Sequence, residues 1–220
     1  FRDFWARQYT DTPPFLGNTP WFDIQPQAIP KTATDSLTAH ITMEEYMAAL
    51  STAKKGAPGT DGVDAPMLKA ATVEVHQRIL ASMNEVLIPG AETPEAWRKA
   101  RIVLIPKDGS PANPANYRPI SLLQVSYKLF TKIITNRLSV VANEYILSSS
   151  QLGFRPGMSS QSALRAVVDI IEDATRRDRE IHVAYVDFKK AFDSVRHAAL
   201  LKTLTHYGLG ENFIDLVRRL

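Results

Sequence analysis

The chain has 220 residues, of which 45% are hydrophobic and 22% charged, so we expect one globular domain, or one domain with a tail, around a sizeable core. It holds no cysteine and no run of about 18 apolar residues, which excludes disulfides and thiolate metal sites and argues against a transmembrane helix. The net charge of +3 is concentrated in residues 97–140, where eight Lys and Arg stand against one Asp; such a basic block favours a polyanion partner, with a solvated surface face as the alternative.

Residues 1–40 hold five prolines and seven aromatic residues without periodicity. The prolines exclude long helices, and the aromatic residues argue against free disorder. We expect an extended arm packed on a neighbouring surface, or a linker. Because the chain begins with Phe1 and shows no signal-like pattern, we expect it to be a piece of a longer protein. The absence of cysteine fits an intracellular protein, and we expect no membrane partner.

A capping box at Thr42 to Glu45 predicts a helix with Tyr46, Met47 and Leu50 facing inward. Lys54 and Lys55 follow, and then a glycine-rich loop at residues 56–62.

Asp64, with Pro66 in the first turn, predicts the start of a helix whose apolar residues keep helical spacing up to Pro89. A glycine loop before a helix N-terminus can meet a phosphate, although this loop lacks the spacing of a Walker or dinucleotide loop.

Residues 101–105 and 117–120 predict the two arms of a β-hairpin joined by a turn at residues 107–110. Lys107 is expected near its tip and Arg118 on the returning arm. A lysine point charge and an arginine fork suit a triphosphate. The alternative is a solvated surface hairpin.

Ser121 is expected to cap a long helix with an apolar face that includes Leu129 and Ile133. Lys128 and Lys132 stand four residues apart on another face, which can lie against a nucleic-acid backbone or be solvated.

A loop at residues 151–157 precedes a helix capped by Ser159 or Ser160. Its apolar side chains are expected to face inward: Leu164, Val167, Ile171 and Ala174.

Residues 181–188 form an apolar run typical of a buried strand, and Asp187 lies near its end. Lys189 and Lys190 follow, then Phe192, and then Asp193 as the cap of a helix that ends at Gly208, before a last helix at residues 213–220. A carboxylate, a basic turn and an aromatic ring can together hold a metal ion, a triphosphate and a sugar. A lone Asp at a strand end is, however, more often a turn former or a cap.

In series, five motifs resemble the reverse transcriptase of non-LTR (LINE-type) retrotransposons. They are APGTDG at residues 57–62, WRKARIVLIPK at 97–107, NYRPISLL at 116–123, QLGFRPGMSS at 151–160 and AYVDFKKAFDSV at 184–195. The resemblance implies an α+β fold: a right-hand polymerase with fingers at residues 41–180, including the hairpin, and the first part of the palm at residues 181–220, including a central strand. Group II intron maturases are the nearest alternative.

The resemblance also implies residue roles in RNA-directed DNA synthesis. Asp187 matches the first catalytic aspartate, and the Phe188 carbonyl matches an accessory ligand for one of two Mg²⁺ (or Mn²⁺) ions. Lys107 and Arg118 match cations that hold the dNTP, and Phe192 matches the gate that excludes a ribose 2′-OH. Residues expected to face the RNA template and DNA primer are Lys54, Lys55, Gly59, Lys128, Lys132, Gln151, Gly153, Phe154 and Arg155.

The sequence departs from the family in holding no two adjacent aspartates, and no Pro-Gln-Gly type motif follows Asp187. We therefore expect a truncated segment that needs further palm and thumb and does not polymerise alone. A non-catalytic nucleic-acid-binding remnant and a relic without function stay open as alternatives.

Overall fold

The computed structural model describes residues 25–188, 191–192 and 194–220. It is rich in helices and has one small sheet, in which two strands pair antiparallel. Within these residues, no helix combines the length and the apolar character needed to cross a membrane. The elements in chain order are α2 (Lys31–Ser36), α3 (Met43–Ser51), α4 (Ala65–Lys69), α5 (Val73–Val86), η2 (Glu95–Arg98), β1 (Arg101–Pro106), η3 (Pro114–Asn116), β2 (Tyr117–Leu122), α6 (Val125–Tyr145), α7 (Ser160–Arg176), α8 (His197–His206) and α9 (Glu211–Arg219).

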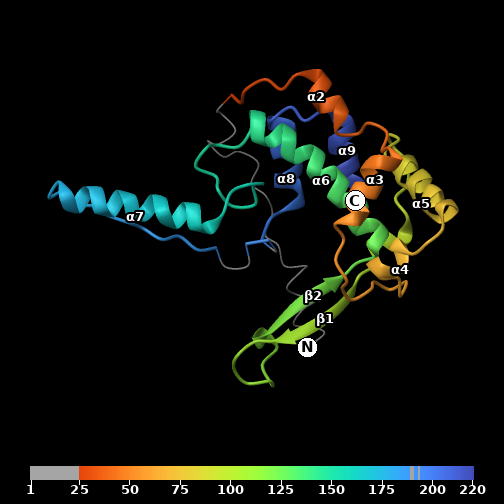
Figure 1. The fold of residues 1–220 in the computed structure, drawn as a ribbon, viewed down its shortest axis with the longest axis horizontal. Helices are drawn as coiled ribbons and strands as arrows, with labels where there is room; N and C mark the ends of the chain where they lie inside the picture. Colours follow the sequence, from red (N-terminus) through yellow and green to blue (C-terminus); the bar gives the residue numbers. More distant parts are fainter. Residues whose placement is uncertain (1–24, 189–190, 193) are drawn as a thin grey trace.

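The core is built around α6, which runs through the middle of the molecule (Figure 1). Its Phe130 and Ile133 are buried together with Tyr46 of α3. Phe213 and Leu216 of α9 complete the same cluster. The core therefore joins segments from opposite ends of the described chain.

The predicted arm at residues 1–40 falls largely outside the described residues, since its first 24 are not among them. Its remainder is not simply extended: α2 forms directly after Pro30, and Leu37 is fully buried in the core. The six-residue length of α2 agrees with the proline spacing that excludes long helices.

Three helix starts are confirmed together with their caps. The Thr42 hydroxyl accepts the Glu45 N–H at 3.2 Å, and the Asp64 carboxylate accepts the Met67 N–H at 2.9 Å. Ser159 likewise caps α7.

The expectation that Met47 of α3 faces inward is wrong, because the Met47 side chain is exposed.

The single helix expected from Asp64 to Pro89 is wrong, because it is two helices. Residues 70–72 separate α4 from α5, and Thr72 adopts an extended conformation with ψ of 164°. Helical spacing of apolar residues continues across this break, so periodicity alone could not reveal it.

The hairpin is confirmed, but Ser121 does not cap the helix after it. Ser121 pairs with Ile102 within the sheet, and α6 begins only at Val125. Continued strand pairing therefore moves the helix cap from the expected Ser121 to Gln124, three residues later.

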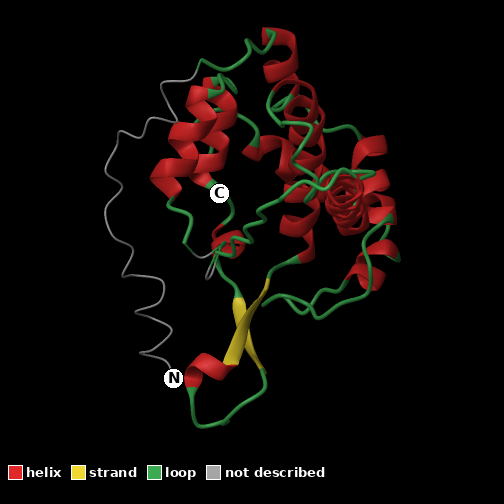
Figure 2. Ribbon diagram, turned by 90° about the vertical axis from the view of Figure 1, so that its left-hand side faces the viewer, coloured by secondary structure: helices red, strands yellow, loops and turns green. Residues whose placement is uncertain are grey.

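Two contacts seat the hairpin on α6, and the strands project away from the helices (Figure 2). Before β1, the Trp97 ring packs on Tyr127 and Phe130, with ring centroids 5.3 and 5.1 Å away. After β2, Gly59 lies so close to the chain that a Cβ there would be 2.7 Å from the Gln124 nitrogen. Both arms are thus held where they leave the helical body.

Arg137 of α6 joins three segments. Its guanidinium donates to the Glu45 carboxylate at 2.8 and 2.6 Å and to the Ala39 carbonyl at 2.6 Å. The Arg137 side chain is only 12% exposed, so the Arg137–Glu45 ion pair is a partly buried, bidentate one. Arg137 is therefore occupied in holding the fold.

Arg219 plays a similar part at the end of α9. It donates to the Val86 carbonyl at 3.1 Å and to the Ala91 carbonyl, and it pairs with Asp215 at 2.8 Å. The Gly90 N–H, and next the Arg219 guanidinium, hold the pKa of Asp215 below its usual value. These contacts fasten α9 to the end of α5.

Two expectations for residues 159–188 are wrong. Helix α7 projects away from the rest of the chain (Figure 1), none of its residues is buried, and Leu164 is 65% exposed. Residues 181–188 form no strand. A strand is stabilised by hydrogen bonds to a neighbour, and among the described residues β1 and β2 pair only with each other. The following helix is confirmed as α8, while its expected cap Asp193 lies outside the described residues.

Candidate functional site

The strand register places Lys107 and Arg118 on one face of the hairpin. Arg118 lies opposite Ile105, and the Lys107 N–H donates to the Asn116 carbonyl at 2.6 Å, which continues the ladder by one pair beyond the strands. Opposite residues, and residues two apart along a strand, share a face. Lys107 and Arg118 are therefore diagonal neighbours near the hairpin tip.

Both side chains are exposed. Within the described part of the chain, neither forms an ion pair with a carboxylate. Two cations on one face without counter-ions can bind the oxygens of a polyphosphate: the ammonium as a point charge and the guanidinium as a fork.

A second group surrounds Asp187. The side chains of Asp187, Phe188 and Phe192 are all exposed, and Lys189 and Lys190 lie outside the described residues. Among residues 25–188, 191–192 and 194–220, no group of three His, Asp or Glu side chains could hold a metal ion. Asp187 thus offers one hard oxygen ligand, which does not fit a two-ion centre without further carboxylates.

The loop at residues 151–157 presents an aromatic ring to this group. Arg155 donates to Asn143 Oδ1 at 2.9 Å and to the Ser148 carbonyl at 2.8 Å, so it holds the loop in shape. Phe154 is 93% exposed with a φ of 61°, and its ring meets that of Phe192 edge-on at 6.0 Å. The sequence did not predict this contact, since no local pattern relates two rings 38 residues apart.

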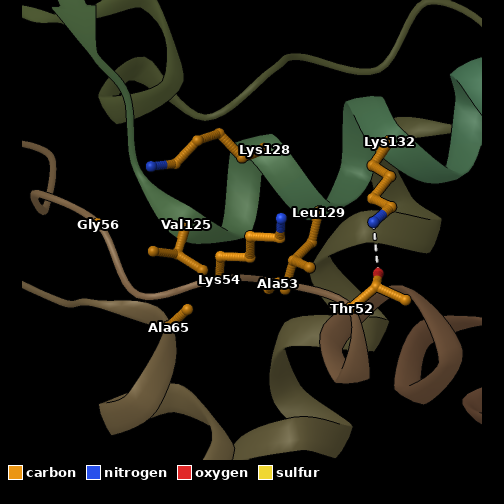
Figure 3. A pocket seen from close by; sticks show the side chains of 9 residues that line it. All are labelled: Thr52, Ala53, Lys54, Gly56, Ala65, Val125, Lys128, Leu129 and Lys132. Carbon is orange, nitrogen blue, oxygen red and sulfur yellow. Dashed lines mark hydrogen bonds between the residues drawn. The ribbon is translucent and has the colours of Figure 1, made fainter.

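Three predicted nucleic-acid residues meet at one cavity of about 240 Å³ (Figure 3). Lys54 comes from the loop after α3, and Lys128 and Lys132 come from α6. Lys132 Nζ donates to Thr52 Oγ1. Neighbouring Lys55 does not line the cavity, and Gly59 is buried against the chain at Leu123 and Gln124.

The described residues therefore form three separate groups: the hairpin cations, the Asp187 segment with its ring pair, and the lysine cavity. No hydrogen bond or ion pair in the described part of the chain joins Asp187 to Lys107 or Arg118. Sequence reasoning found the members of each group but could not show which of them meet.

Comparison with known proteins gives a family match. The family model described as reverse transcriptase (RNA-dependent DNA polymerase) matches residues 105–219, which include the hairpin cations and Asp187.

Among known proteins, the chain is similar to a probable RNA-directed DNA polymerase from transposon BS of Drosophila melanogaster, with 32% identity over 80% of this chain and 20% of the relative. It is also similar to the RNA-directed DNA polymerase from the mobile element jockey of the same organism, with 31% identity over 73% of this chain and 18% of the relative. A Pol polyprotein of the type-1 retrotransposable element R2 of Popillia japonica is 32% identical over 78% of this chain and 23% of the relative. The chain spans about a fifth of the length of these relatives.

Proposed function

Because the chain belongs to the reverse transcriptase (RNA-dependent DNA polymerase) family, with relatives in non-LTR retrotransposons, we propose that it supplies the nucleotide-binding part of an RNA-directed DNA polymerase. In this proposal residues 41–180 form the fingers and residues 181–220 the start of the palm. The substrates are an RNA template, a DNA primer and dNTPs.

The observation that carries the proposal is the shared face of Lys107 and Arg118. An incoming dNTP brings a triphosphate whose charge has to be neutralised while the nucleotide is held for transfer. Two cations that pair with no carboxylate among the described residues, diagonal to each other at a hairpin tip, provide this without a deep pocket. Seating of the hairpin by Trp97 and Gly59 gives the two cations a defined position relative to α6.

Asp187, Phe188 and Phe192 form the second part of the proposal, and this part needs carboxylates beyond those of the described residues before it could hold two ions. Asp187 and the Phe188 carbonyl offer oxygen ligands of the kind that Mg²⁺ or Mn²⁺ prefers. Phe192 offers a rigid ring that would collide with a ribose 2′-OH and so select deoxynucleotides. The 79% exposure of the Phe192 side chain leaves it accessible to a sugar.

A titration with a fluorescent dNTP analogue tests the proposal. We expect Lys107→Gln and Arg118→Gln each to weaken binding about tenfold or more, since a charge-assisted hydrogen bond contributes about 1.5–3 kcal/mol. Arg118→Lys keeps the charge but loses the two-pronged guanidinium, so its affinity for the dNTP analogue should lie between those of the unaltered chain and Arg118→Gln. The control is Arg78→Gln, an exposed arginine on α5. If both hairpin variants bind like this control, the proposed nucleotide site is wrong.

RNA binding without catalysis is the second candidate function. The lysine cavity favours it, because this basic site does not depend on Asp187. A chain that binds RNA but no dNTP would support this candidate over the first.

A further inference from the structure

Phe154 holds a backbone conformation that a phenylalanine rarely adopts. Its φ is 61°, in the left-handed region, where the Cβ atom crowds the following carbonyl oxygen. Its ring is 93% exposed, so packing of this side chain into the core does not compensate for the strained backbone. A strained backbone that presents an apolar ring to solvent indicates a functional position.

Arg155, the next residue, holds Phe154 in this conformation. The Arg155 guanidinium donates to Asn143 Oδ1, near the end of α6, at 2.9 Å and to the Ser148 carbonyl at 2.8 Å. The Arg155 side chain is half-buried, so these hydrogen bonds anchor the loop to the helix. Because Arg155 follows Phe154 directly, the same anchor fixes the direction in which the Phe154 side chain leaves the backbone.

The Phe154 ring meets the ring of Phe192. Their centroids are 6.0 Å apart and their planes cross at 83°, which is the edge-to-face geometry that aromatic pairs prefer. Phe192 is itself 79% exposed, so the rest of the described chain covers little of its ring. A side chain with few neighbours exchanges freely between its rotamers. The contact with Phe154 therefore gives the Phe192 ring a constraint on its orientation.

We propose that Phe154 is a positioning residue that holds the Phe192 ring in place and thereby sharpens the selection of deoxynucleotides over ribonucleotides. A ring that rotates aside admits a ribose 2′-OH at little cost, whereas a ring held in one orientation excludes it. This inference rests on the proposed function, because Phe154 acts only through Phe192. It gives Phe154 a different task from the strand contact expected from the family resemblance.

The test compares how tightly the 220-residue chain binds a fluorescent dATP analogue and the matching ATP analogue in the presence of Mg²⁺. The ratio of the two dissociation constants measures selection against the 2′-OH. Phe154→Asn removes the ring and keeps a residue type that tolerates a positive φ. We expect this variant to lower the ratio by about two- to tenfold, which is the contribution of one aromatic pair to an equilibrium constant. Affinity for the dATP analogue should stay unchanged, because Phe154 does not touch the nucleotide in this proposal.

Matched variants show whether Phe154 acts through Phe192. Phe154→Tyr keeps the ring and should keep the ratio. Phe192→Ala should abolish the selection, and adding Phe154→Asn to it should change nothing further, because a positioning residue has no effect without the residue that it positions. Met158→Ala removes an exposed apolar side chain just after the same loop and should leave the ratio unchanged. Circular dichroism checks that every variant is folded.

Each other outcome overturns the proposal in a distinct way. An unchanged ratio in Phe154→Asn means that the ring contact plays no part in selection, and equal weakening of both analogues means that Phe154 supports the site as a whole. A further change when Phe154→Asn is added to Phe192→Ala means that Phe154 acts independently of Phe192. If the unaltered chain binds neither analogue, the proposed function fails as well, and if it binds both equally, the role given to Phe192 fails with this inference. If selection depends on Phe192 but not on Phe154, this inference alone fails.

Discussion

Substitution Gly59→Ala tests whether the glycine loop is there to seat the hairpin. The added methyl group would lie 2.7 Å from the Gln124 nitrogen, 2.8 Å from the Leu123 carbonyl carbon and 2.9 Å from the Gln124 Cα. All three are backbone atoms at the junction of β2 and α6, so they cannot rotate aside as a side chain would. We expect the loop and the junction to move apart, which costs about 1–3 kcal/mol of unfolding free energy.

Gly56→Ala is the matched control in the same loop. A methyl group there meets nothing within 4 Å, and alanine restricts the unfolded chain, so this variant should be unchanged or stabilised by about 0.4–1 kcal/mol. Urea unfolding followed by circular dichroism should therefore separate the two variants by about 1–4 kcal/mol. Equal unfolding free energies of Gly59→Ala and Gly56→Ala would refute the packing role of Gly59. Equal losses of RNA binding in these two variants would instead favour a direct contact between the loop and the RNA.

Three further predictions concern the two arginine contacts and catalysis. Arg137→Ala should lower the unfolding free energy by about 3–5 kcal/mol, because it leaves the Glu45 carboxylate and the Ala39 carbonyl without their donor. Arg165→Ala, which breaks an exposed ion pair, should lower it by less than about 1 kcal/mol. Similar losses for the two variants in urea unfolding would contradict this prediction. Since the pKa of Asp215 is lowered by folding, its contribution is present above the pKa of the unfolded chain and disappears as the pH falls through the lower folded value. The stability difference between Asp215→Asn and the unaltered chain should accordingly shrink in acid, and a difference independent of pH would exclude this linkage. Finally, the chain alone should give no Mg²⁺-dependent primer extension, because no two aspartates in it are adjacent; robust extension by the purified 220-residue chain would prove this wrong.

Local features of the fold were predictable because they depend on neighbouring residues. Thr42, Asp64 and Ser159 cap helices through hydrogen bonds three residues ahead, and each cap is confirmed. The β-branched run before Lys107 and the glycine turn after it predicted the hairpin, which the register confirms.

Features that depend on distant partners were not predictable in the same way. The apolar residues of α7 and of residues 181–188 carry the pattern of buried elements, yet they are exposed, because burial requires a second surface that periodicity does not specify. The break between α4 and α5 at Thr72 was not predictable either, because the helical spacing of apolar residues continues across it.

The candidate residues were predicted one by one, but their grouping required the fold. Lys128 and Lys132 could be placed on one helix face from their spacing. That Lys54 joins them, while Arg137 turns to Glu45 instead, follows from how the loop after α3 and the core helices pack.

The attachment of α9 also bears on how the chain is made. The Gly90–Asp215 hydrogen bond spans 125 residues and the Thr93–Arg219 bond spans 126, and Phe213 fills the core beside α6. A ribosome adds about 5–20 residues per second, so the interval between the synthesis of α6 and that of α9 is on the order of ten seconds. The core is therefore left open on the nascent chain during that interval, and it closes late rather than from the N-terminus onward.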